Sequence, residues 1–235
     1  MLYRLFLSCL FSILCIVNTC SAACPITHAV LAKKFWEYYP KYNEEEKSAF
    51  MVGTLFPDIR YIDACEREFT HFPNVTLDDV LNAPTPFSAG MLFHSYVDLH
   101  RENFVVENKL YEYIAHLDSP RPTTLLKVVE DEHYYNSATL QYCRNCLKNN
   151  LDEELQQGID KDKVDEWHFV VTNWFSYMPS TILYYLSIRK MSVLDINAEE
   201  VGIMYQHHHQ LISDPFMQNY TKNLMIYFEE LFAQK

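Results

Sequence analysis

Helical periodicity constrains the fold of this chain more than any other feature of its sequence. Apolar residues recur at intervals of three and four through most of the length, and no alternating pattern of useful length for a strand occurs. Only 4 glycines are present among 235 residues. The sequence therefore predicts an all-α fold, a multi-helix bundle.

The expected helices are long and few. They cover residues 27–40, 43–56, 86–117, 123–148, 161–190, 196–213 and 215–233. Thr27 is the predicted N-cap of the first, the acids after Asn43 suit the N-terminus of the second, and Pro179 is expected to bend the fifth. Residues 56–74 are predicted to form a loop with short turns. Because no linker, repeat or low-complexity run divides the chain, one domain is expected.

The first 23 residues have the layout of a secretory signal peptide. Arg4 precedes an apolar run over residues 5–17, and the small residues Ser21, Ala22 and Ala23 follow. A membrane anchor is the competing interpretation, but the apolar run is short for a span. We therefore expect cleavage near Ala23. The mature domain, residues 24–235, would then be exported, periplasmic or secreted, without a transmembrane anchor.

The chain is acidic. It has 19 Lys and Arg against 31 Asp and Glu, a formal net charge of −12, and removal of residues 1–23 takes away only Arg4. Such a surface repels phosphate backbones at long range. This charge argues against a general nucleic-acid binder, although it leaves room for a local cationic site.

Four cysteines follow the expected cleavage point: Cys24, Cys65, Cys143 and Cys146. An even number in an exported protein suggests disulfides, whose pairing the sequence leaves open. Cys143 and Cys146 form a C-x-x-C pair, but no second pair completes a zinc ribbon, and no βαβ context supports a redox motif. We interpret this pair as structural.

The stretch "AGMLFHSYVDLHRENF" carries the first candidate for chemistry. His94 and Asp98 are four residues apart on an expected helix, so their side chains can converge on one metal ion. Gly90, one turn earlier, would leave room for a ligand. The alternative is an ordinary hydrogen bond between His94 and Asp98 on the helix face.

Three more residues are candidate metal ligands or catalytic groups. His28 lies close to the expected mature N-terminus, and Asp58 and His71 lie in the predicted loop between apolar neighbours. Acids and histidines in such positions are often ligands or catalytic groups. Each alone is more often a hydrogen-bonded loop residue.

Taken in order, the stretches "ITH", "GTLFPD", "TH" and "FHSYVD" resemble the zinc-dependent phospholipase C and single-strand nuclease superfamily. The resemblance covers roughly residues 25–105. It implies an all-α bundle with metal ions clustered in a cleft.

The resemblance also implies a ligand set. One metal would be held by Asp58, His71, His94 and Asp98, and Asp98 would bridge to a second metal that His28 also reaches. Nitrogen and carboxylate ligands suit zinc, with one to three ions expected. Asp58 also matches the acid proposed as the general base in that family.

The expected function follows from this resemblance. It is that of an exported zinc-dependent phosphoester hydrolase in which a metal-activated water attacks phosphorus. Arg60 can pair with phosphate oxygens, or it can be a surface ion-pair residue. The net charge favours a phospholipid or another small phosphoester as substrate over nucleic acid.

The chain departs from the family pattern in its later part. Phe104 stands where the family commonly has a histidine, and no later histidine has an acid four residues on. Glu130, Asp131 and His133 are candidate substitute ligands. The alternatives are a catalytically degenerate relative that acts as a helical binding protein, and a helical interaction protein without metal. His207–His209 are expected mostly on the surface, since adjacent helical positions diverge by about 100°.

Overall fold

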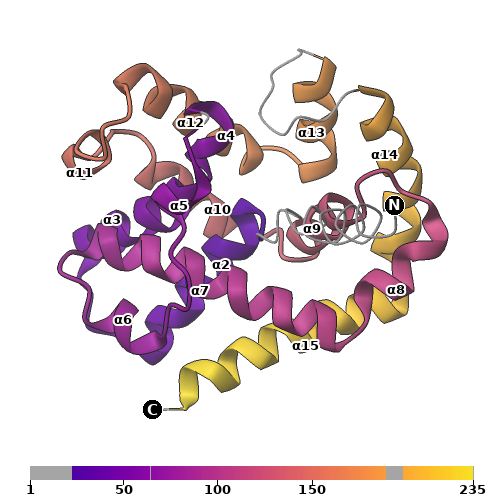
Figure 1. Cartoon of the computed structure of the whole chain (residues 1–235), viewed down its shortest axis with the longest axis horizontal. Coiled ribbons are helices and arrows are strands. Elements are labelled where there is room, and N and C mark those ends of the chain that lie inside the picture. Colours follow the sequence, from indigo (N-terminus) through magenta and orange to yellow (C-terminus); the bar gives the residue numbers. More distant parts are fainter. Residues whose placement is uncertain (1–22, 64, 189–197, 235) are drawn as a thin grey trace, which may run out of the picture.

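The chain folds into helices throughout the part that the structure describes (Figure 1). The structure is a computed structural model and describes residues 23–63, 65–188 and 198–234. Within these residues no strand occurs, which confirms the predicted all-α class. The predicted signal peptide lies outside the described residues, apart from Ala23.

Helix α2 (Pro25–Tyr38) lies in the middle of the bundle. Helices from all parts of the chain pack against it: α3 (Glu44–Leu55), α7 (Pro86–Glu107), α9 (Pro122–His133), α10 (Ser137–Cys146), α12 (Lys161–Trp174) and α15 (Pro215–Ala233). Residues close to the expected mature N-terminus are therefore enclosed by the rest of the protein.

The predicted loop between α3 and α7 is a chain of short helical turns. They are η1 (Phe56–Ile59), α4 (Arg60–Asp63), α5 (Arg67–Thr70) and α6 (Leu77–Leu81). This segment carries the candidate residues Asp58, Arg60 and His71.

Three of the long expected helices are broken: 86–117, 123–148 and 161–190. The stretch 86–117 divides into α7, α8 (Leu110–Ile114) and η2 (Ala115–Leu117), because Lys109 adopts a left-handed conformation with φ of 55°. The stretch 123–148 divides into α9 and α10, where the side chain of Asn136 accepts hydrogen bonds from the first turn of α10. Local backbone conformation and capping thus end helices that periodicity alone would continue.

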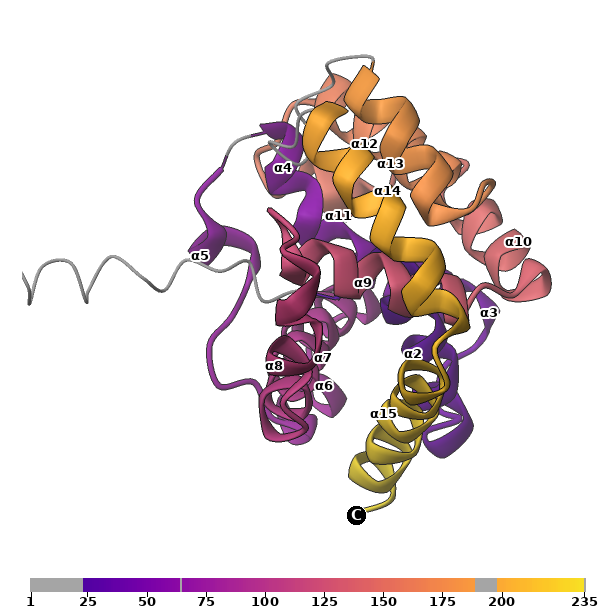
Figure 2. The ribbon, with the colours of Figure 1, turned by 90° about the vertical axis from the view of Figure 1, so that its right-hand side faces the viewer.

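The C-terminal half completes the bundle. It contains α11 (Asp152–Leu155), α12, α13 (Pro179–Ile188), α14 (Ala198–Ser213) and α15. Pro179 begins α13 instead of bending a continuous helix, and the first two residues of the expected helix 196–213 lie outside the described part. Helices α13 and α14 pack on α9, and α15 runs back past α9 and α2 (Figure 2).

The two predicted helix starts have different outcomes. The helix expected after Asn43 begins at Glu44, and Asn43 forms a capping box with Glu46. Thr27 lies inside α2, which already begins at Pro25, and its hydroxyl donates instead to Asp131 of α9. Pro25 can start the helix because the first turn needs no donor from it.

Glycines let α3 and α7 approach until their backbones touch. A Cβ atom added at Gly53 would lie 2.0 Å from the carbonyl oxygen of Phe87, and one at Gly90 would lie 2.1 Å from that of Phe50. Gly90 therefore makes room for α3 and not for a ligand, which corrects the expectation from sequence.

A buried ion pair fastens α7 to α9. Arg101 donates two hydrogen bonds of 2.9 Å to the carboxylate of Glu130, and both side chains are fully buried. Tyr220 of α15 donates a third at 2.6 Å. Breaking such a pair on one side leaves an uncompensated buried charge, so these residues hold three helices in one arrangement.

No disulfide joins the four cysteines of the described chain. Cys24, Cys65, Cys143 and Cys146 are all free, and the Cys143 thiol lies 3.8 Å from the sulfur of Met51. The disulfides suggested by the even count are absent from this part of the structure. No helix among the described residues has the length and apolarity that a membrane span requires.

Candidate metal centre

Five side chains from four separate segments meet inside the bundle. Each is at most 6% exposed, and they come from α2, η1, the end of α5 and α7: His28, Asp58, His71, His94 and Asp98. These are the five residues expected as metal ligands, and the structure brings all of them together.

Asp98 is central to the cluster. Its Oδ1 lies 3.2 Å from Nε2 of His28, and its Oδ2 lies 3.5 Å from Nε2 of His94 and 3.7 Å from Nε2 of His71. Burial raises the pKa of Asp98, but the facing His94 and His28 hold it well below its usual range. The carboxylate therefore stays ionised and offers one oxygen to each side of the cluster.

His94 is oriented by a backbone carbonyl of α3. Its Nδ1 lies 2.9 Å from the carbonyl oxygen of Thr54. A carbonyl can only accept, so Nδ1 carries the proton and the Nε2 lone pair of the neutral ring faces the cluster. The close approach of α3 at Gly90 places Thr54 there. Burial lowers the pKa of His94, but Asp98, Asp58 and the Thr54 carbonyl together raise it, so its net shift is upward.

His71 is oriented in the same way by a hydroxyl. Thr70 donates its hydroxyl hydrogen to the carbonyl of Pro57 at 2.9 Å, so its oxygen accepts from Nδ1 of His71, also at 2.9 Å. The Nε2 lone pair of His71 then points into the cluster. Burial and His94 lower the pKa of His71 to about 2, which keeps it in the neutral form that binds metals.

His28 and Asp58 bring unsatisfied polar atoms to the same place. Neither ring nitrogen of His28, nor Oδ1 of Asp58, has a well-aligned hydrogen bond from the described residues. The ring of His28 stacks on His94 with centroids 3.9 Å apart, and burial lowers its pKa. Buried polar atoms normally have partners, so atoms without one in the protein point to a ligand.

The spacing of the ligand atoms fits a metal ion. Two nitrogens bound to one tetrahedral zinc lie about 3.3 Å apart. Here Nε2 of His94 and Nε2 of His71 are 3.1 Å apart, and Oδ1 of Asp58 is 3.7 Å from His71. Two groups of three ligand atoms lie within 4.8 Å of one another: His28, His94 and Asp98, and Asp58, His71 and His94. These buried groups could hold a metal ion.

The candidate substitute ligands on α9 are engaged elsewhere. Glu130 is saturated by Arg101 and Tyr220. His133 contacts the carbonyl of Ile212 and the hydroxyl of Thr221, each at 3.1 Å. The structure does not bring these side chains to the cluster.

Asp131, the third candidate on α9, binds the start of α2. Its carboxylate accepts from the backbone nitrogens of Ile26 and Thr27, from the hydroxyl of Thr27, and from Nε1 of Trp174, at 2.7 to 3.0 Å. Burial raises the pKa of Asp131 to about 7, although these four donors lower it. Asp131 thus fixes the chain immediately before His28.

Asp131→Asn is expected to destabilise the protein by about 3 kcal/mol, because an amide cannot accept all four hydrogen bonds and turns a donor towards buried donors. Urea denaturation of the variant and of wild type measures the difference. Asp165→Asn, at an exposed residue of α12, is the control and should change stability by less than about 0.5 kcal/mol. Equal stability of the two variants would show that Asp131 does not anchor α2.

Two residues at the edge of the cluster carry positive charge. Nε of Arg60 lies 3.9 Å from Oδ1 of Asp58, and its guanidinium lies over the ring of Tyr61. Nη2 of Arg67 donates to Oδ2 of Asp98 at 3.2 Å. Arg60 was expected near the site from its sequence position. Arg67 was not, although it stands four residues before His71.

Other contacts to the cluster were also not predicted from the sequence. The backbone nitrogen of Ala23 donates to Oδ1 of Asp98 at 2.9 Å, and Thr54 and Thr70 orient the histidines. The position of Ala23 beside the expected cleavage point was the only available signal. Phe104 packs against Tyr220 and Tyr227.

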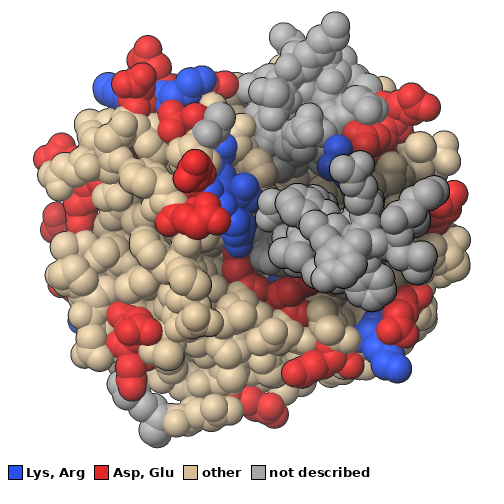
Figure 3. Space-filling view, in the orientation of Figure 1, with Lys and Arg blue, Asp and Glu red and all other residues tan. Residues whose placement is uncertain are grey.

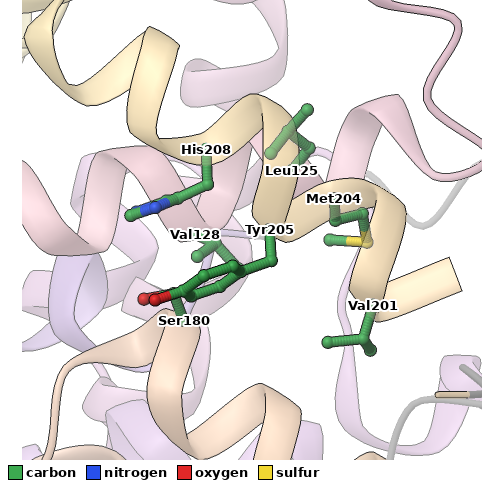
Figure 4. Close-up of a pocket in the computed structure, with 7 residues that line it drawn as sticks. All are labelled: Leu125, Val128, Ser180, Val201, Met204, Tyr205 and His208. Carbon is green, nitrogen blue, oxygen red and sulfur yellow. The ribbon is translucent and has the colours of Figure 1, made fainter. Parts of the chain in front are cut away.

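A separate small cavity lies between α9, α13 and α14 (Figure 4). It is lined by Leu125, Val128, Ser180, Val201, Met204, Tyr205 and His208, and its volume of about 10 Å³ is close to that of one water. His208 is buried, contrary to the surface position expected for His207–His209, because it pairs with Glu132 at 2.6 Å. This cavity is too small for a substrate.

Comparison with known proteins adds nothing to these observations: no family model, no curated protein and no solved structure matches the chain.

Proposed function

We propose that this protein is an exported zinc-dependent phosphoester hydrolase, similar in its chemistry to the zinc-dependent phospholipases C. The observation that carries the proposal is the convergence of His28, Asp58, His71, His94 and Asp98 in one buried cluster. The two oxygens of Asp98 face different histidines, which suits a carboxylate that bridges two ions.

The residues present fit zinc. Neutral imidazole nitrogens and carboxylate oxygens are common zinc ligands, and second contacts to a carbonyl and a hydroxyl orient two of the rings. Zinc held there would lower the pKa of a coordinated water towards neutrality and withdraw charge from a phosphoryl oxygen.

The chain's own residues would supply the remaining functions. Asp58 would take a proton from the attacking water through the carboxylate oxygen that does not bind the ion, since its side chain is buried in the cluster. Arg60 lies beside Asp58 and can donate to phosphate oxygens.

The start of the mature chain belongs to the same site. The Ala23 nitrogen is a hydrogen-bond donor to Asp98, so cleavage before Ala23 would leave its amino group next to the bridging carboxylate. We propose that the N-terminal signal segment directs export and that its cleavage before Ala23 completes the site.

A phospholipid or another small phosphoester is the proposed substrate. The net charge of −12 disfavours long polyanions. Two exposed aromatic residues also flank His71, Phe69 at 49% and Phe72 at 38%, and offer apolar surface beside the cluster.

Reconstitution with zinc tests the proposal. Zinc-loaded protein should hydrolyse phosphatidylcholine vesicles or bis(4-nitrophenyl) phosphate, and protein stripped with a chelator should not. Asp58→Asn should lower kcat by about 100-fold or more if Asp58 acts as the general base. Single-stranded DNA serves as the third substrate and should be cleaved more slowly.

One observation favours a second candidate function, that of a metal-binding helical protein without catalysis. Phe104 is a core aromatic, and the α9 acids are engaged in structural contacts, so no third ion has ligands among the described residues. Zinc uptake without hydrolysis of any of the three substrates would support this candidate.

A further inference from the structure

Arg67 connects the buried cluster to solvent. Its Nη2 donates to Oδ2 of Asp98 at 3.2 Å, while 34% of its side chain is exposed. The five cluster side chains are at most 9% exposed. A molecule that reaches the cluster from solvent on this side would therefore meet Arg67.

The other end of the guanidinium fork has no hydrogen-bond partner in the described part of the chain. Nη1 of Arg67 is buried and makes no hydrogen bond with any described residue. A guanidinium presents its donors in a planar fork that matches two oxygens of a phosphate. Nη2 of Arg67 is thus bonded to Asp98, and Nη1 is left to donate to a ligand.

Asp98 has partners other than Arg67. Its Oδ1 lies 3.2 Å from Nε2 of His28, and its Oδ2 lies 3.5 Å from Nε2 of His94. Arg60 lies on the other carboxylate of the cluster, at 3.9 Å from Asp58. Each acid of the cluster is therefore paired with one arginine.

The positive charge of Arg60 and Arg67 contrasts with the net negative charge of the chain. The chain has 31 acidic against 19 basic residues, so an anion gains little from the overall field. Figure 3 shows Lys and Arg side chains near the centre of one face, with acidic side chains beside them. An anion near the cluster can be held only by specific local contacts, which Arg60 beside Asp58 and Arg67 beside Asp98 provide.

We infer that Arg67, together with Arg60, forms a phosphate subsite at the entrance of the metal cluster, in which Arg67 binds the non-reacting oxygens of the phosphoryl group. This inference rests on the proposed function, since the phosphate is held against bound zinc. Arg67 positions the ester and determines specificity for phosphate, and takes no proton itself.

Binding of inorganic phosphate to zinc-loaded protein tests this subsite. Titration calorimetry compares wild type with Arg67→Gln, Arg67→Lys and Arg121→Gln, and elemental mass spectrometry gives the zinc content of each. Arg121 is the matched control, because it is a similarly exposed arginine, at 39%, in an ion pair with Glu200.

The expected result is that all four proteins hold the same zinc, while Arg67→Gln binds phosphate at least about tenfold more weakly. Arg67→Lys keeps the charge but loses the fork and should lie between, and Arg121→Gln should match wild type. With a phosphodiester substrate, Arg67→Gln should raise KM more than it lowers kcat.

Three outcomes would overturn the inference. Unchanged phosphate affinity in zinc-loaded Arg67→Gln would show that Arg67 does not bind the anion, and would leave the metal site intact. Loss of zinc in that variant would show that Arg67 serves only to hold Asp98. Absence of zinc in wild type would instead contradict the proposed function, and the subsite with it.

Discussion

Asp98→Asn is expected to abolish zinc binding at both positions of the cluster. The two carboxylate oxygens of Asp98 face His28 on one side and His94 and His71 on the other. An amide offers only one oxygen and no charge, so neither position keeps a full ligand set. Wild type should contain about two zinc ions per chain and the variant fewer than about one.

The same substitution should remove the stabilisation by zinc. A ligand at 1,000 times its Kd stabilises the native state by about 4 kcal/mol. Chelation should therefore lower the Tm of wild type by several degrees and leave that of Asp98→Asn unchanged. Asp165→Asn, an exposed substitution of the same kind, should respond like wild type. A variant that retains two ions would show that Asp98 is no bridging ligand.

Gly90→Ala is expected to destabilise the protein by about 3 kcal/mol or more. The added methyl would lie 2.1 Å from the carbonyl oxygen of Phe50 and 2.6 Å from the nitrogen of Thr54. These are backbone atoms of α3, so α3 and α7 must separate to accept it. The separation would also move the Thr54 carbonyl away from His94, and zinc affinity should fall.

Gly202→Ala is the matched control. Gly202 lies in α14, and a Cβ there meets no atom within 4 Å. Alanine favours a helix over glycine, so this variant should be stabilised by up to about 1 kcal/mol. Urea denaturation followed by circular dichroism compares the two. Stability of Gly90→Ala within 1 kcal/mol of wild type would show that the helices do not touch as described.

The helical class and the five cluster residues could be predicted because their signals are local or ordered along the chain. Periodicity marks buried helix faces, and His94 and Asp98 share one face by spacing alone. The ends of helices were less predictable. Lys109 breaks a stretch that remains periodic, because a left-handed residue leaves little trace in an apolar pattern.

Contacts between distant segments could not be predicted. Nothing in the sequence of α9 shows that Asp131 binds the start of α2, or that Glu130 pairs with Arg101, and both acids looked equally suited to a metal. The contact of Arg67 with Asp98 was not predicted, because it depends on how α5 lies relative to α7. Gly90 was predicted to leave room for a ligand, because the sequence does not show that α3 crosses α7 at this glycine.

Anomalous diffraction at the zinc edge, on crystals grown with zinc, tests the central claim most directly. We expect two peaks, one about 2.0–2.2 Å from ligand atoms of Asp58, His71, His94 and Asp98, and the other beside His28 and the second oxygen of Asp98. The two groups of ligand atoms within 4.8 Å of one another share His94 and lie around these positions. Crystals without an anomalous peak inside this cluster would contradict the account.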